Sequence, residues 1–372
     1  MNSVLANGNT TALGSAAVLD QLISTVSPSG DLATVITAMG QLATQEEVSQ
    51  AVSQTLPLHV GASAQAATNA MHSLNRIVQA RTESNQGLSS GEEFFEDGYV
   101  WMKPFGAWAE QDNRGSVVGF ESDSSGLAIG TDAVLDSRVR VGLVGTYAET
   151  AVDSKSVTAQ RTDVDVLQLA AYGSYNVNAR SDFNWQVDVG SNESKGHRSI
   201  RFGGLDRVAT SDFDSLSMHA MVGAGYLFPV SHALSIAPAV RVDYARVETD
   251  GYTERGAGAL NLRVEDSTYE ELLLALETKA VHDLGAAWRV FGSAGVGFDF
   301  INDHAQAVSS FEGGGASFVA SGIDVSPWVY RAGAGLSRQT ERGVEFSLRY
   351  DAEGRTSGFL NQTLSARARI AF

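Results

Sequence analysis

From residue 99 to residue 372 the chain alternates apolar and polar residues, a pattern typical of β-strands that bury only one face. Each stretch keeps its apolar residues on one parity and its charged residues on the other. Four stretches show this with the apolar positions Phe183, Trp185, Val187 and Val189; Leu234, Ile236, Val240, Val242 and Tyr244; Trp288, Val290, Ala294, Val296, Phe298 and Phe300; and Val344, Phe346, Leu348 and Tyr350.

The joins between these stretches alternate between short and long. Short joins include PVSH and QTER, and long joins include SKGHRSIRFGGLDRVAT and NDHAQAVSSFEGGGASFVASGIDV. About twelve antiparallel strands are predicted, near 99–111, 125–135, 138–150, 161–177, 181–195, 211–228, 233–249, 264–282, 286–301, 326–338, 342–352 and 359–372. An even strand count with short turns on one rim and long loops on the other predicts an all-β transmembrane barrel of the outer-membrane type.

An antiparallel sandwich with one hydrated face would also alternate. Twelve amphipathic strands without a second apolar layer to receive them favour the barrel. Strands of about 12 to 18 residues exceed the nine to eleven that cross a bilayer, so we expect them to project on the long-loop side. Aromatic residues near strand ends fit membrane-interface girdles; they are Trp101, Phe105, Trp185, Tyr226, Phe228, Trp328 and Tyr350.

The last strand, LSARARIAF, places its apolar residues on one parity and its arginines on the other. Barrel closure gives this strand a neighbour on each side, so its apolar parity is expected to face lipid. The opposite parity of the strands is expected to line the lumen, where charges pair or stay hydrated. The predicted lumen-facing charges are Asp243, Asp299, Glu345, Arg349, Arg367 and Arg369.

Residues from about 13 to 84 have helical rather than alternating spacing. VLDQLISTV, DLATVITAMGQLA and TQEEVSQAVSQTL are bounded by residues that favour helix ends, and Thr44 with Glu47 predicts a capping box. The longest candidate, SAQAATNAMHSLNRIVQARTES, is only weakly apolar and suits a narrow, hydrated enclosure. A plain helical bundle or linker before residue 55 is the alternative. QGLSSGEEFFEDG, residues 86–98, marks a boundary.

Composition narrows the function classes. A net charge of −17 with no basic stripe argues against nucleic acid as a partner. The absence of cysteine excludes disulfides, thiolate metal sites and a cysteine nucleophile. The sequence has no run of about 18 apolar residues, so no transmembrane helix is predicted. MNSVLANGNT is unlike a secretion signal, so a barrel in an outer membrane is expected to be a fragment of a longer protein.

The sequence predicts no catalytic, cofactor or metal site. It has no G-x-S-x-G elbow, and EGGGAS lacks the lysine of a phosphate-binding loop. Its histidines are scattered without metal-ligand spacing; they are His59, His72, His197, His219, His232, His282 and His304. Ordinary surface or lumen histidines account for this distribution.

The helical prefix LPLHVGASAQAATNAMHSLNRIVQAR, the hairpin GLAIGTDAVLDSRVRVGLVGTYAET and the ending YDAEGRTSGFLNQTLSARARIAF resemble the C-terminal translocator β-domain of type V secretion autotransporters with its helical junction. The resemblance covers residues 99–372 in pattern. It implies a helical passenger-proximal or junction region at 1–60, a lumenal helix and linker at 61–98, and an outer-membrane barrel at 99–372. The lumenal helix is expected to plug the barrel, with Met71, Leu74, Arg76, Val78 and Arg81 on it.

The resemblance further implies an anchor and translocation unit that carries an N-terminal passenger to the surface of a Gram-negative cell. The long loops and the passenger then lie at the cell surface. The implied partners are outer-membrane lipids, the passenger and the barrel-assembly machinery, with a monomeric barrel. The assembly signal is expected at Leu364, Ala366, Ala368, Ile370 and Phe372.

Two alternatives stay open at the level of sequence. One is a passive porin or structural surface barrel whose long loops bind a partner. The other is passenger release by cleavage at a lumenal asparagine, for which Asn69, Asn75 and Asn85 are candidates by position only. The passenger's identity and the place of residues 1–55 relative to the barrel are not decided by the sequence.

Overall fold

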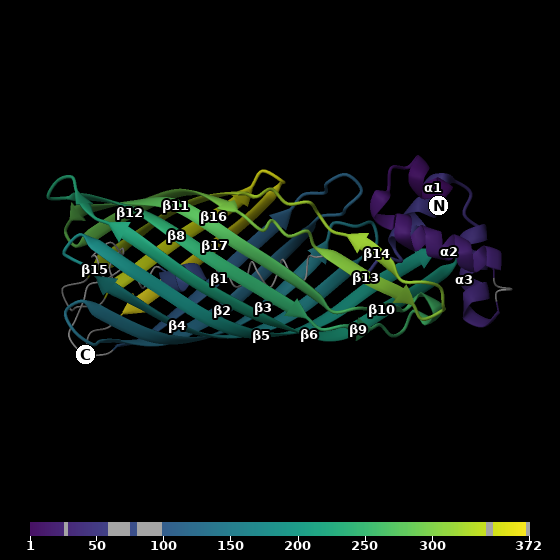
Figure 1. Ribbon diagram of the computed structural model, residues 1–372, viewed down its shortest axis with the longest axis horizontal. Helices are drawn as coiled ribbons and strands as arrows, with labels where there is room; N and C mark the ends of the chain where they lie inside the picture. The colour runs from purple at the N-terminus through teal and green to yellow at the C-terminus, as the bar shows by residue number, and fades with distance from the viewer. Residues whose placement is uncertain (26–28, 59–74, 80–98, 340–344, 370–372) are drawn as a thin grey trace.

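A computed structural model describes residues 1–25, 29–58, 75–79, 99–339 and 345–369. Twelve long antiparallel strands close into the barrel of Figure 1. They are β1 Tyr99–Gln111, β2 Phe120–Val134, β3 Val139–Ser154, β4 Gln160–Asn176, β5 Ser181–Phe202, β6 Leu205–Tyr226, β8 Leu234–Thr249, β11 Ser267–Gly285, β12 Trp288–Asp299, β15 Trp328–Gln339, β16 Glu345–Arg355 and β17 Phe359–Arg369. Strand β17 pairs with β1, and β8 pairs with β11, so no edge strand remains in the barrel. The predicted barrel and its strand number are confirmed.

The two faces of the barrel wall differ in polarity as predicted. Leu143 and Leu169 point outward and are 61% and 62% exposed, whereas Gln168 and Gln186 point inward and are buried. On β17, Leu364 and Ala366 are exposed on the outer face. The other expected residues of that apolar parity, Ala368, Ile370 and Phe372, have side chains outside the described part of the chain.

The joins lie at two different rims. The short-turn rim carries the turns around residues 135–138, 177–180, 227–233 and 286–287, with the two-residue β7 Phe228–Pro229 beside them. The long-join rim carries the other joins, including 112–119, 250–266 and 300–327. This asymmetry follows the predicted rhythm of connections.

One predicted long loop is wrong. The segment SKGHRSIRFGGLDRVAT continues β5 and β6 as a two-stranded ribbon, closed by a turn at Gly203 and Gly204 with positive φ of 51° and 83°. Likewise β2 begins at Phe120, five residues before the predicted start. In both places the strand extends past the part of the wall whose outward residues are apolar. Its outward residues there are mostly polar, so the alternation that predicts a membrane strand is lost.

The long joins contain structure of their own. A second sheet has the order β14–β13–β10–β9 and is built from β9 Tyr252–Thr253, β10 Leu262–Val264, β13 Gln306–Phe311 and β14 Phe318–Ser321. A 3-10 turn, η3 Gly258–Leu260, precedes β10. These elements stand on the long-join rim, where the sequence predicted loops.

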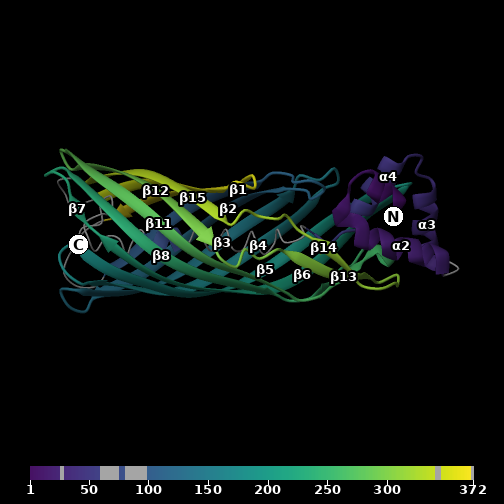
Figure 2. The same ribbon diagram turned by 45° about the horizontal axis from the view of Figure 1, so that its top comes forward.

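The N-terminal helices lie beyond the long-join rim, at the right-hand end of Figures 1 and 2. They are α1 Asn2–Ala6, the 3-10 helix η1 Thr10–Ala12, α2 Leu13–Thr25, α3 Gly30–Gly40 and α4 Gln45–Ser53. The capping box predicted for Thr44 and Glu47 is present at the start of α4. None of the helices in the described ranges is long and apolar enough to cross a membrane.

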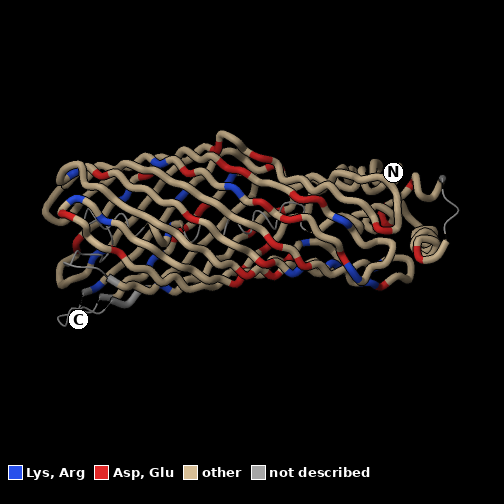
Figure 3. Tube along the Cα trace, turned by 60° about the horizontal axis from the view of Figure 1, so that its bottom comes forward, with Lys and Arg blue, Asp and Glu red and all other residues tan. Residues whose placement is uncertain are grey.

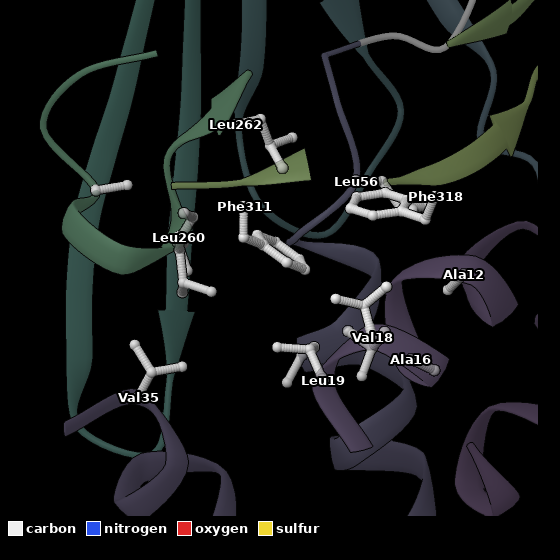
Figure 4. Packing of buried hydrophobic residues seen from close by; sticks show 14 of the residues in the cluster. Ala12, Ala16, Val18, Leu19, Val35, Leu56, Leu260, Leu262, Phe311 and Phe318 are labelled. Atoms are coloured by element: carbon white, nitrogen blue, oxygen red, sulfur yellow. The ribbon is translucent and has the colours of Figure 1, made fainter. Parts of the chain in front are cut away.

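These helices and the rim elements share one apolar core. In Figure 4, Phe311 from β13 lies near Leu19 of α2 and Leu260 of η3. We call residues 1–58 the cap, and the β5–β6 ribbon, residues 250–266 and the β13–β14 hairpin the platform. The cap therefore sits at the mouth of the barrel, a question that the sequence left open.

Candidate functional site

The barrel lumen holds a helical turn of the chain itself, residues 75–79. Arg76 Nη2 lies 2.7 Å from Glu353 Oε2 on β16, and Asn75 Oδ1 accepts a hydrogen bond from Gln186 on β5. Gln79 donates to Glu277 of β11 at 3.1 Å. Contacts to strands on different sides of the barrel place this turn inside the lumen.

The turn also makes apolar contacts with the inner wall of the barrel. Ile77 and Val78 are buried in a cluster with the inward residues Phe105, Val144 and Tyr172. The sequence predicted Arg76 and Val78 as lumenal residues, and both lie in the lumen. It missed Ile77, because a single buried isoleucine in a polar helix leaves no periodic signal. Met71, Leu74 and Arg81 lie outside the described residues.

Paired charges surround the turn. Arg331 of β15 bridges Glu277 and Glu353, each at 2.9 Å. Since Glu353 also pairs with Arg76, the carboxylate joins the barrel wall to the lumenal turn. Buried charges are stable only when they are paired and hydrogen bonded. The signal for Arg331 was its inward parity in the otherwise apolar strand VYRAGAGL.

A second buried group joins β5, β6 and β8. His219 lies between two carboxylates, with Nδ1 2.7 Å from Asp188 Oδ2 and Nε2 3.2 Å from Asp243 Oδ1. Arg241 Nε lies 2.7 Å from the other oxygen of Asp243. Asp243 was predicted to face the lumen and does so. His219 was expected only as an ordinary surface or lumen histidine, and its inward parity was the available signal for its place in this group.

The remaining predicted lumen charges fall into two sets. Arg349 lines the lumen and pairs with Asp351 at 2.6 Å, and Asp299 is buried 3.6 Å from Arg355. Arg355 also pairs with Glu271 at 2.8 Å. The side chains of the other three, Glu345, Arg367 and Arg369, lie outside the described residues.

A row of outward carboxylates marks where the apolar belt ends. Glu149, Asp165, Glu193 and Asp214 stand directly opposite one another on β3, β4, β5 and β6. Tyr147 precedes them and donates to both Glu149 and Asp165 at 3.1 Å. Figure 3 shows acidic residues gathered on the part of the wall toward the cap. A row of outward carboxylates is incompatible with hydrocarbon, so the cap lies beyond the bilayer.

The described residues offer little for other chemistry. Within the described ranges, no group of three or more His, Cys, Asp or Glu residues is arranged to hold a metal ion. Of the asparagines considered for self-cleavage, Asn75 is hydrogen bonded by an amide, Gln186. Asn69 and Asn85 lie outside the described residues.

Residues 100–351 match the family model described as Autotransporter beta-domain. The chain belongs to the autotransporter family. Its β-domain is an outer-membrane translocation unit of Gram-negative bacteria, and such domains are translocators rather than enzymes.

Known proteins agree with this membership. Outer membrane protein A of Rickettsia rickettsii is 25% identical over 312 residues, which are 80% of this chain and 14% of that protein. The translocator domain of the autotransporter NalP from Neisseria meningitidis has the same fold, with a TM-score of 0.64, 15% identity, and coverage of 82% and 98% of the two chains. The transport unit of the autotransporter AIDA-I from Escherichia coli also has this fold, with a TM-score of 0.52 and 13% identity. The match covers 78% of this chain and 97% of that one.

The chain spans 14% of the length of the first curated relatives that it matches.

Proposed function

We propose that this chain anchors an N-terminal passenger in the outer membrane and carries it through the barrel lumen to the cell surface. One observation carries the proposal: residues 75–79 occupy the lumen, while residues 1–58 lie beyond the long-join rim. The chain thus occupies both the lumen and the outer rim, as expected for a polypeptide exported through its own barrel. The long-join rim then faces the cell exterior.

The inner wall suits such a passage. Its polar side chains keep a moving backbone hydrated, and closure of the barrel satisfies the backbone groups within hydrocarbon. We assign residues 1–60 to the passenger-proximal junction, 61–98 to the lumenal helix and linker, and 99–372 to a monomeric barrel without catalytic activity. The barrel would bind outer-membrane lipids on its apolar face, and no nucleic acid.

The last strand is proposed to direct assembly. Leu364 and Ala366 lie on the outer face of β17, and the rest of the proposed signal is Ala368, Ile370 and Phe372. Replacing Phe372 and deleting Ile370 should reduce insertion by the barrel-assembly machinery. Normal insertion of that variant would remove the assembly role, while the barrel and the lumenal turn would be unaffected.

A conductance experiment separates the translocator from a passive porin. The intact chain and a variant without residues 1–90 are reconstituted separately in planar bilayers. A translocator plugged by its own segment should conduct weakly when intact and several-fold more after the deletion. Equal, large conductance from both proteins would contradict the plug and favour a porin.

A further inference from the structure

We infer that the platform is a folding template for the cap, so that residues 1–58 acquire their structure only on the barrel's outer rim. The first observation is the composition of the shared core. Among the described residues, eleven of its buried apolar side chains come from the cap and ten from the platform. Removing either half exposes the other, so the cap has no complete core of its own.

Helix α3 packs on the platform through close backbone contact and an ion pair. A side chain at Gly203, in the β5–β6 turn, would come within 1.9 Å of the Ala38 carbonyl oxygen, so only glycine allows this approach. Asp31 accepts from Arg207 Nη1 at 2.7 Å and from the Ala259 amide at 2.6 Å. These contacts fix α3 to two parts of the platform, the β5–β6 ribbon and residues 250–266.

A buried arginine fixes the end of the cap. Arg198, at 0% exposure on β5, pairs with Glu254, and its Nη2 donates to the Leu260 carbonyl at 3.0 Å. Its Nη1 donates to the Gln54 carbonyl of the cap. Without the cap, this guanidinium loses an acceptor at a site built to exclude water, which is costly. The platform is therefore complementary to the cap in polar as well as apolar groups.

The cap's helices are too short to be stable alone. They contain 5, 13, 11 and 9 residues, and isolated helices below about 12 to 15 residues are marginal in water. Almost half of the buried apolar side chains around these helices come from the platform, so the helices lack the packing partners that would stabilise them.

The test uses the full-length chain in detergent and follows proteolysis of residues 1–58. Leu260→Asp places a charge in the shared core from the platform side, and Leu19→Asp does so from the cap side. Val208→Asp, on the exposed face of the β6 extension, is the matched control. Heat-dependent gel migration reports whether each barrel is folded.

Both core variants should lose protection of residues 1–58 by at least about tenfold, since cleavage follows the population of the open form. Val208→Asp should leave protection unchanged, and all three barrels should stay folded. Wild-type protection of the cap in Leu260→Asp would overturn the template, because the cap would then be autonomous. If Leu260→Asp fails to assemble, Phe318→Asp supplies the same disruption from the β13–β14 hairpin.

A disulfide provides a second measurement. Thr11 Oγ1 and Ser116 Oγ are 3.0 Å apart, and the chain has no natural cysteine. Thr11→Cys with Ser116→Cys should cross-link cap to rim, and adding Leu260→Asp should abolish the cross-link; efficient cross-linking with Leu260→Asp would contradict the template. Labelling of Glu46→Cys, an exposed cap position, on intact cells by a membrane-impermeant thiol reagent tests the direction of export separately: labelling supports a cap at the cell surface, and protection from the reagent contradicts it.

Discussion

The lumen and the core beneath the cap are both closed interiors, but paired charges line the first and apolar side chains fill the second. Strand β5 passes through both. Its inward face carries Gln186 and Asp188 in the lumen and Ile200 and Phe202 in the cap core. Its outward face changes in the opposite sense, from exposed Val187 to the charged residues around 193–197.

The exchange of polarity along one strand shows that the surroundings decide which face is apolar. Where the wall meets hydrocarbon, the apolar side chains face out and the interior is free to be polar. Where the same strands rise into water, the ordinary arrangement of a soluble protein returns. The row of carboxylates from Glu149 to Asp214 marks the crossing point.

The largest effect is expected from breaking the lumenal charge network. Glu353→Ala leaves Arg76 and Arg331 without a shared partner and should lower the free energy of unfolding by about 3 to 5 kcal/mol. Urea unfolding in detergent measures it. Glu193→Ala, on the outer face above the belt, is the control and should change little. If Glu353→Ala and Glu193→Ala lower the free energy of unfolding equally, ion pairs in the lumen do not stabilise the barrel, and the account is contradicted.

A charge on the lipid face should have the next largest effect. Leu169→Arg puts a guanidinium on the belt at a position that is 62% exposed, and should destabilise the barrel by about 2 to 4 kcal/mol in lipid. Val208→Arg, exposed on the β6 extension, should cost close to nothing. Unfolding in vesicles compares them, and a neutral Leu169→Arg would place the belt elsewhere.

A cavity in the cap core should act locally. Val35→Ala removes two methyl groups from a fully buried side chain and should destabilise the cap by about 2 kcal/mol. Hydrogen exchange should rise in the cap helices and on the platform, while amides of the barrel wall keep their protection. Faster exchange throughout the barrel would show that the two interiors unfold as one unit.

The smallest effect concerns pH. Arg207 lowers the pKa of Asp31 below its ordinary value of about 3.9. The contact therefore stabilises the cap fully at pH values above the pKa that Asp31 has in the unfolded chain. This stabilisation is lost as the pH falls through the lower pKa that Asp31 has in the folded protein. Cap protection should weaken below about pH 4, by at most about 1 kcal/mol, because the carboxylate is partly exposed. Asp31→Asn should remove this pH dependence of cap protection. If the variant keeps the pH profile of the wild-type protein, the pair of Asp31 and Arg207 contributes nothing to it.

The sequence predicted the barrel well because the bilayer enforces a period of two in each spanning strand. It predicted that Asp243, Asp299 and Arg349 face the lumen, since parity alone decides that. It did not predict their partners, because pairing across the lumen depends on register and closure, which no local pattern encodes. The β5–β6 ribbon was missed because the strands there lie outside the hydrocarbon. Their apolar residues change from the outer to the inner face, so the pattern that predicts a membrane strand ends before the strands do.

Spin labels along β4 test the central claim most directly, because the chain offers no competing cysteine. Single cysteines at Leu167, Gln168, Leu169 and Ala170 are labelled in protein reconstituted in lipid, and accessibility to oxygen is measured. We predict high accessibility at Leu167 and Leu169 and low accessibility at Gln168 and Ala170. Uniform or inverted accessibility would contradict an outward apolar face and an enclosed polar lumen.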